Sequence, residues 1–141
     1  MGKELAREGW RAFVAAVLEH FGARVTAVEV GSTINRRRWS GYGTAGFFAA
    51  WDIARQETRH FGVQLAGPNV TDFEPLYNVA ILSRMHKLGQ LPDIHTNNLF
   101  SERVTEPERF DHRILGFRLA TRLKVNLVKK ARLLKKITSE F

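Results

Sequence analysis

The chain has 141 residues, enough for one domain with a continuous core, and its 44% hydrophobic and 26% charged residues are typical of a globular protein. The formal net charge is +8, and there is no cysteine, which excludes disulfides, thiolate metal sites and cysteine nucleophiles. No apolar run approaches the roughly 20 residues of a membrane-spanning helix, and the first residues lack the apolar stretch of a secretory signal. These features predict one soluble, cytoplasmic domain over residues 1–141.

The first half of the chain alternates helical and extended patterns. Apolar residues recur at helical spacing over 3–21, and the β-branched run over 25–30 predicts a strand. A second helix is expected over 44–60, with Thr44 as its cap. The aromatic residues at helical spacing should lie in the core: Trp10, Phe13, Phe47, Phe48 and Trp51.

Two further strand–helix units follow. Residues 63–66 predict a short strand, and residues 76–88 predict the helix after it. A weaker third strand is expected over 92–96. The last unit ends in a long helix over 112–137, where apolar residues recur every four positions beneath an otherwise basic surface.

This order of elements predicts an α/β fold. Strands that are separated by helices cannot pair as hairpins, so a parallel sheet with right-handed crossovers follows. Three strands are few for a parallel sheet, which is normally covered on both faces. Both edges would also be open to pairing with another chain. We therefore expect one part of a larger barrel or assembly, with self-association through the open edges as one outcome.

The candidate binding residues follow the expected strands. Ligands of parallel α/β sheets gather at the carboxyl ends of strands, where the loops can vary without disturbing the core. Carboxylates, amides, a histidine and a tryptophan suit a sugar, because polar groups bind hydroxyls and aromatic rings stack on sugar faces. The candidate residues at these ends are Asn35, Arg36, Trp39, Asn69, Asp72, Glu74, His95, Asn97, Asn98 and Glu102.

Three motifs occur in an order that resembles a known enzyme family. Residues 29–36, Glu-Val-Gly-Ser-Thr-Ile-Asn-Arg, followed by Trp39, resemble the end of strand four in retaining glycoside hydrolases of the family 39 type. Residues 67–74, Gly-Pro-Asn-Val-Thr-Asp-Phe-Glu, resemble the next strand end, and residues 92–95 lie where such barrels place a histidine after strand six. The resemblance spans most of the chain. It implies strands four to six of a (β/α)8 barrel, in a hydrolase-like branch found with bacterial surface-polysaccharide genes.

The chain also departs from the family pattern. The family has its acid/base glutamate in a Gly-Asn-Glu-Pro motif after strand four, where this chain has Gly-Ser-Thr-Ile over 31–34. The family nucleophile follows strand seven, beyond the matching segment. Retaining hydrolysis needs two carboxyl groups roughly 5 Å apart. The resemblance therefore implies a carbohydrate-processing protein that is inactive alone, with Asp72, Glu74 and His95 as the catalytic candidates.

Each catalytic candidate has a structural alternative. Asp72 and Glu74 also suit a turn or a helix cap, and His95 also suits a purely structural hydrogen bond. The spacing of the histidines and carboxylates supports no metal site. Neither glycine-rich phosphate-binding motif is present, so we expect no cofactor.

The basic C-terminal segment supports a second function. No acidic residue lies between His112 and Ser139, and the three arginines at 36–38 form a second basic cluster. The alternative to a sugar-related protein is a non-enzymatic module that binds an anionic partner: a membrane surface, lipopolysaccharide, a phosphate-bearing glycan or nucleic acid. Nucleic acid is the least favoured of these partners, because no helix-turn-helix, zinc-finger or RNA-recognition signature occurs. A solvated helix face would give the same charge pattern.

Overall fold

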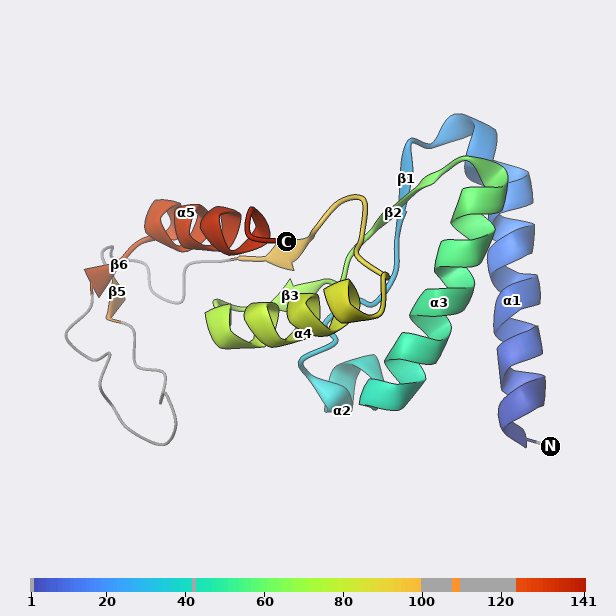
Figure 1. Ribbon diagram of the computed structural model, residues 1–141, viewed down its shortest axis with the longest axis horizontal. Helices are drawn as coiled ribbons and strands as arrows, with labels where there is room; N and C mark the ends of the chain where they lie inside the picture. Colours follow the sequence, from blue (N-terminus) through green and yellow to red (C-terminus); the bar gives the residue numbers. More distant parts are fainter. Residues whose placement is uncertain (1, 42, 100–107, 110–123) are drawn as a thin grey trace.

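The computed structural model describes residues 2–41, 43–99, 108–109 and 124–141 (Figure 1). The described helices are α1 (Gly2–Phe21), α2 (Arg37–Ser40), α3 (Thr44–Phe61), α4 (Pro75–Lys87) and α5 (Leu127–Thr138), with a 3-10 turn at Gly22–Arg24. The described strands are β1 (Ala27–Glu29), β2 (Gln64–Ala66), β3 (Val70–Thr71), β4 (Asn97–Asn98), β5 (Glu108–Arg109) and β6 (Lys124–Val125). None of the described helices is long and apolar enough to cross a lipid bilayer.

The first three long helices agree with the sequence pattern. The helices expected over 3–21, 44–60 and 76–88 begin and end within one residue of α1, α3 and α4. Thr44 is the first residue of α3, and Gly43 occupies the cap position, so the cap expected from Thr44 is wrong. Gly62 ends α3 with a left-handed backbone, φ +67°, a conformation that glycine adopts without steric cost.

Three segments of the chain form one parallel arrangement. Val28 of β1 lies opposite Leu65 of β2, and Val70 of β3 lies opposite Asn97 of β4. A parallel bridge between Ala66 and Ile94 joins the two pairs. The segments therefore lie side by side in chain order, and the expected α/β fold with parallel strands is confirmed for the described part of the chain.

The third strand differs from the one expected over 92–96. Only Ile94 of that range pairs with β2, and pairing resumes at β4, which the sequence pattern had placed in a loop. The Gly67 N–H donates to the Ile94 carbonyl at 2.9 Å, but Pro68 has no N–H to donate to a neighbouring strand. The ladder is therefore interrupted at Pro68 and starts again at β3.

The predicted start of the long helix expected over 112–137 is also wrong. Residues 124–125 form β6, which pairs antiparallel with β5. The helix α5 begins only at Leu127, because the Asn126 side chain accepts a hydrogen bond from the Lys129 N–H at 2.9 Å and caps it. The earlier part of the expected helix, 112–123, lies outside the described residues.

The main core forms around Trp51 of α3. This side chain is 0% exposed, and its indole Nε1 donates to the Gln90 carbonyl at 2.8 Å. Phe47 and Phe48 are also buried, as expected from their spacing. Phe13 is 59% exposed, so its expected place in the core is wrong. The next residue, Val14, packs in the core instead, because successive side chains of a helix point about 100° apart.

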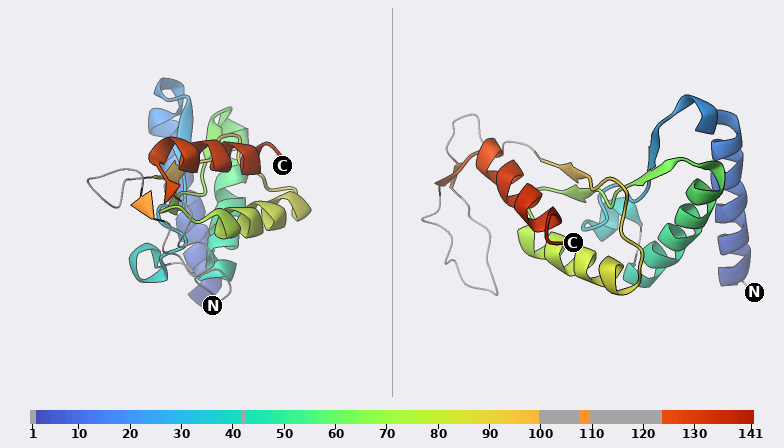
Figure 2. Two further views of the ribbon diagram at one scale, coloured as in Figure 1. Left: turned by 90° about the vertical axis from the view of Figure 1, so that its left-hand side faces the viewer. Right: turned by 45° about the horizontal axis from the view of Figure 1, so that its top comes forward.

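The two faces of β1 and β2 have different surroundings. Val28 and Leu65 pack in the core with residues of α3 and α4, and Val28 also contacts the cluster that α1 forms. Glu29, which follows Val28, and Gln64, which precedes Leu65, are exposed. Since side chains alternate between the faces of a strand, the helices cover one face and leave these positions of the other face open. Figures 1 and 2 show α1 and α3 side by side at one end of the molecule, and α4 and α5 at the other.

Candidate functional site

A buried asparagine occupies the centre of the strand ends. Asn69 precedes β3 and is only 5% exposed. Its Nδ2 donates to Glu29 Oε1 at 3.0 Å and to Asn98 Oδ1 at 3.3 Å. These three residues form a polar row across the three parallel segments, which we call the strand-end row. The Oδ1 of Asn69 is buried and has no hydrogen-bond partner among the described residues.

The backbone that leads into Asn69 requires glycine. Gly67 has φ +136°, and a Cβ at this position would lie 2.5 Å from the Val30 carbonyl oxygen and 2.9 Å from the Trp51 ring. No side chain fits there without displacing β1 or the core. The close approach of Gly67 to β1 therefore helps to bring Asn69 within reach of Glu29.

A second asparagine holds the loop after β1 against β3. The Asn35 Nδ2 donates to the Thr71 carbonyl at 2.7 Å, and the Thr71 N–H donates to Asn35 Oδ1 at 3.0 Å. The Thr71 hydroxyl also lies 3.2 Å from the hydroxyl of Thr33, which has a positive φ of 56°. Asn35 thus uses both ends of its amide on the protein backbone, and it positions the loop that follows Glu29.

The two acidic candidates, Asp72 and Glu74, meet one guanidinium. Arg36 Nη2 forms an ion pair with Asp72, and it lies 3.3 Å from Glu74 Oε1. The hydrogen bond to Asp72 raises the pKa of Arg36; burial acts in the opposite direction, and the charges of Asp72 and Glu74 add to the rise. Glu74 stands at the cap position of α4 without a side-chain capping bond. Both carboxylates therefore have a structural partner, and their catalytic role stays a prediction.

His95 faces the helices rather than the strand-end row. Its Nε2 lies 2.9 Å from Asn78 Oδ1 and 2.8 Å from Asn97 Nδ2. The Asn78 Nδ2 donates to the Glu74 carbonyl at 2.9 Å. According to the tautomer of the ring, His95 Nε2 either donates to Asn78 Oδ1 or accepts from Asn97 Nδ2. Burial lowers the pKa of His95 and so favours the neutral imidazole, while a hydrogen bond to the Gly67 backbone acts in the opposite direction.

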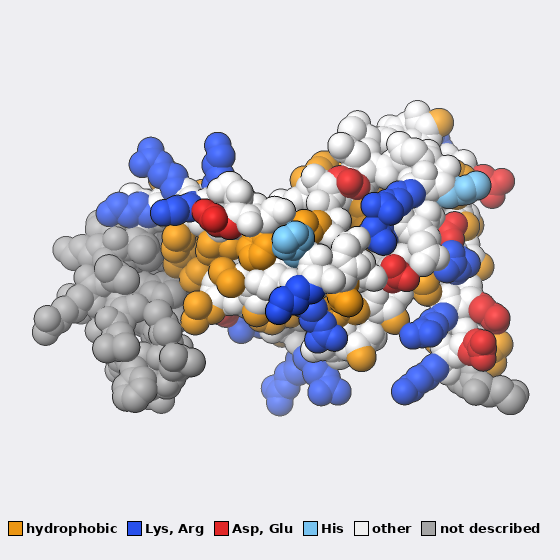
Figure 3. Space-filling view, viewed as in Figure 1, with side chains coloured by type: hydrophobic (Ala, Val, Ile, Leu, Met, Phe, Trp, Pro, Cys, Tyr) orange, Lys and Arg blue, Asp and Glu red, His pale blue; other side chains and the backbone are white. Residues whose placement is uncertain are grey.

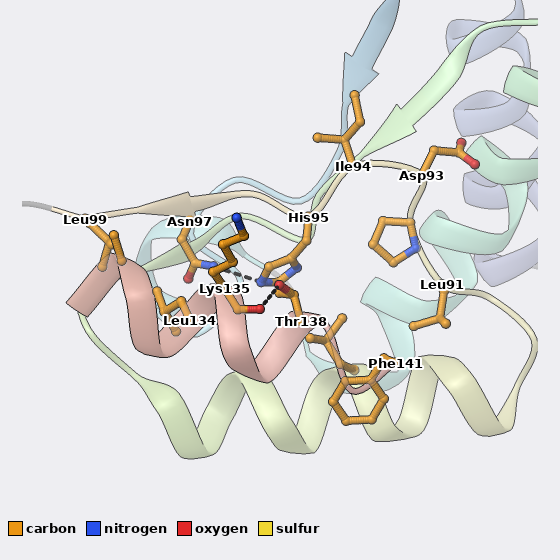
Figure 4. Close-up of a pocket in the computed structure, with 13 residues that line it drawn as sticks. Leu91, Asp93, Ile94, His95, Asn97, Leu99, Leu134, Lys135, Thr138 and Phe141 are labelled. Carbon is orange, nitrogen blue, oxygen red and sulfur yellow. Dashed lines mark hydrogen bonds between the residues drawn. The ribbon is translucent and has the colours of Figure 1, made fainter. Parts of the chain in front are cut away.

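The ring of His95 also borders a cavity beneath α5. The cavity has a volume of about 660 Å³ and lies between the third strand segment, α4 and α5. Figure 4 shows His95 and Asn97 on one side, and Leu134, Lys135 and Thr138 of α5 on the other.

The remaining candidates are separate from the strand-end row. Trp39 lies on α2 and is 85% exposed. Asn97 belongs to the His95 network, and Glu102 lies outside the described residues. Among the residues that the structure describes, no three histidine, aspartate or glutamate side chains gather closely enough to hold a metal ion.

Two residues of these networks were not among the sequence candidates. Glu29 lies at the end of β1, and the alternation of Val28, Glu29 and Val30 was the signal that it faces away from the core. Asn78 is 0% exposed on the inner side of α4, where the signal was a single amide within an apolar helix face.

Comparisons with known proteins add no further assignment. The chain matches no protein-family model, no curated protein and no solved structure. Its function must therefore be inferred from the geometry of the described residues.

Proposed function

We propose that this chain is a carbohydrate-binding segment of a (β/α)8-like barrel and that it does not hydrolyse its ligand alone. The observation that carries the proposal is the strand-end row, in which Glu29, Asn69 and Asn98 come from three adjacent parallel segments. Sugars are bound by groups that both donate and accept hydrogen bonds, and amides together with a carboxylate supply both. The resemblance of 29–36 and 67–74 to strand ends of family 39 glycoside hydrolases supports the same class of ligand.

The exposed ends of the strand-end row indicate where a hydroxyl would bind. Glu29 and Asn98 are exposed, whereas Asn69 between them is buried and shares its Nδ2 between them. A sugar hydroxyl donates a proton and accepts one, which fits the carboxylate of Glu29 and the amide of Asn98. Because Asn69 holds these two side chains together, its loss should disturb the site.

The partial barrel is supported by the uneven covering of the sheet. Helices pack on the side of Val28 and Leu65, while Glu29 and Gln64 on the other side are exposed. In a (β/α)8 barrel the helices lie outside and the strand ends with their loops form the ligand site. Further strands, supplied by another chain segment or a partner, would enclose the open face in this arrangement.

The partners of the carboxylates favour binding without hydrolysis. A retaining mechanism needs an acid/base and a nucleophile on opposite sides of one glycosidic bond. Asp72 and Glu74 are both engaged by Arg36, and Glu29 is hydrogen-bonded to Asn69. This arrangement favours recognition of hydroxyl groups over proton transfer.

Saturation-transfer NMR with a panel of neutral and acidic oligosaccharides tests the proposal. The wild-type chain is expected to bind at least one of them, and Asn69→Leu should lose that signal. Glu29→Gln, a change at an exposed residue that leaves an oxygen for Asn69, should weaken binding roughly ten-fold, as expected for loss of a charged hydrogen-bond acceptor. Gln56→Ala on α3 removes an exposed amide elsewhere and should bind like wild type.

The outcomes separate the class of ligand from the place of binding. No oligosaccharide signal with the folded wild-type chain would contradict the proposed function. A signal that survives in both Asn69→Leu and Glu29→Gln would contradict the strand-end row as the site. Circular dichroism of each variant shows whether the helices are retained.

A further inference from the structure

The outward surface of α5 is strongly basic. The helix contains no acidic residue between Leu127 and Thr138. Its exposed cations are Lys129, Arg132, Lys135 and Lys136. Figure 3 shows blue side chains gathered over this helix, away from the sheet. The concentration of like charges on one helix gives a local positive potential that attracts anions.

Packing of the opposite side fixes the direction in which these cations point. Leu134 is 5% exposed and packs in a cluster with Phe73, Leu99 and Ile137. The Asn126 cap fixes the first turn. The helix is therefore anchored on α4 and its neighbours, and the basic side chains are displayed to the outside as a set.

Two apolar side chains lie among the exposed cations. Val128 is 56% exposed and Leu133 is 42% exposed. Leu133 follows Lys129 by four positions and precedes Lys136 by three, which makes these side chains neighbours on the helix surface. We define the basic face of α5 as Val128, Lys129, Arg132, Leu133 and Lys136.

We propose that the basic face of α5 docks on an anionic phospholipid bilayer. Lysine and arginine near an anionic membrane surface are attracted to its headgroups, and exposed valine and leucine gain by entering the boundary between headgroups and acyl chains. A nucleic-acid backbone would use the cations but would leave Val128 and Leu133 in water. The combination therefore fits lipid better than nucleic acid, and it stands independently of the strand-end row.

The test is co-sedimentation of the 141-residue chain with vesicles. Vesicles that contain phosphatidylglycerol should bind the chain, pure phosphatidylcholine vesicles should not, and added salt should weaken the binding. Lys129→Gln/Arg132→Gln should weaken it roughly 25-fold, because each cation near the surface contributes roughly five-fold. Arg37→Gln/Arg38→Gln on α2 removes the same charge from another exposed site and should bind within about two-fold of wild type.

The apolar pair provides the distinction between lipid and nucleic acid. Val128→Ser/Leu133→Ser keeps every charge and should lower vesicle binding several-fold, while weak binding to duplex DNA should not change. Val128 and Leu133 are both exposed, so loss of the fold is not expected. Lys136→Gln repeats the charge test at a single site. Equal binding of the Lys129/Arg132 and Arg37/Arg38 variants would overturn the proposal. So would tighter binding to DNA than to anionic vesicles.

Discussion

Asn35 and Thr71 are joined by two hydrogen bonds, one to the carbonyl and one to the N–H of the same backbone residue, at 2.7 and 3.0 Å. The Asn35 side chain thereby pairs with the backbone of β3 in the way that a neighbouring strand would. It holds the loop after β1 beside β3, next to Asn69 and the strand-end row. The architecture of the candidate site thus depends on a residue whose amide nitrogen and oxygen both bond to the backbone of Thr71.

Asn35→Ala should destabilise the chain by about 2 kcal/mol, because the Thr71 N–H and carbonyl would lose their partner in a half-buried position. The free energy of unfolding can be measured by urea denaturation followed by circular dichroism. Gln56→Ala also removes two hydrogen bonds, to Arg11 and Asp52, but at an exposed site where water replaces them, so the free energy should change by less than about 0.5 kcal/mol. Equal effects of the two variants would show that the Asn35–Thr71 pair contributes no more than a surface contact.

Gly67→Ala should destabilise the chain by more than about 2 kcal/mol, because the new Cβ would meet the Val30 carbonyl and Trp51. The matched control is Gly9→Ala in α1, where a Cβ has no neighbour within 4 Å. That change should stabilise the chain by roughly 0.5–1 kcal/mol, since alanine favours a helix interior over glycine. Opposite signs for the two variants in the same urea assay are the expected result.

The stability should depend on the protonation of His95. Burial lowers the pKa of His95 in the fold below the ordinary value of about 6.5, which the unfolded chain retains. The unfolded chain therefore binds more protons as the pH falls through about 6.5, so stability is full above this pH and decreases below it.

The variant His95→Gln isolates this effect. The loss of urea stability between about pH 7.5 and about pH 5 should be smaller in His95→Gln than in wild type. His60→Gln makes the same substitution at an exposed site at the end of α3 and serves as the control for loss of an imidazole. A pH profile that is unchanged by His95→Gln would contradict the account of its burial.

The local elements of this fold could be predicted, whereas the networks of its candidate site could not. Helical periodicity and terminal glycines are properties of neighbouring residues, so α1, α3 and α4 follow from the sequence. The bonds from Asn35 to Thr71 and from Asn69 to Glu29 join residues 36 and 40 positions apart. An asparagine in a strand-end loop gives the same pattern whether it meets a ligand or a backbone.

The start of α5 could not be predicted for a related reason. Apolar residues continue every four positions on both sides of Asn126, and this regular spacing conceals the N-cap at which α5 begins. The third strand was misplaced because Pro68 shifts the pairing toward Asn97 and Asn98, which are polar and unusual in a strand.

The open part of the sheet should promote self-association at high protein concentration. Gln64 is exposed on the face opposite the helices, and an uncovered sheet face can pack against the same face of a second chain. Gln64→Lys should weaken association at least about ten-fold in sedimentation equilibrium, because like charges would meet across a face-to-face contact. Gln56→Lys makes the same change of charge on α3 and should not. A strictly monomeric wild-type chain would indicate that the sheet tolerates its open face.

Carbohydrate binding at the strand-end row is tested most directly by heteronuclear NMR of the side-chain amides during titration with an oligosaccharide that binds the chain. The amide resonances of Asn69 and Asn98 should shift together and saturate with the same affinity, while those of Gln56 and Asn126 stay in place. Saturable shifts that are confined to residues away from Glu29, Asn69 and Asn98 would contradict the strand-end row as a carbohydrate site.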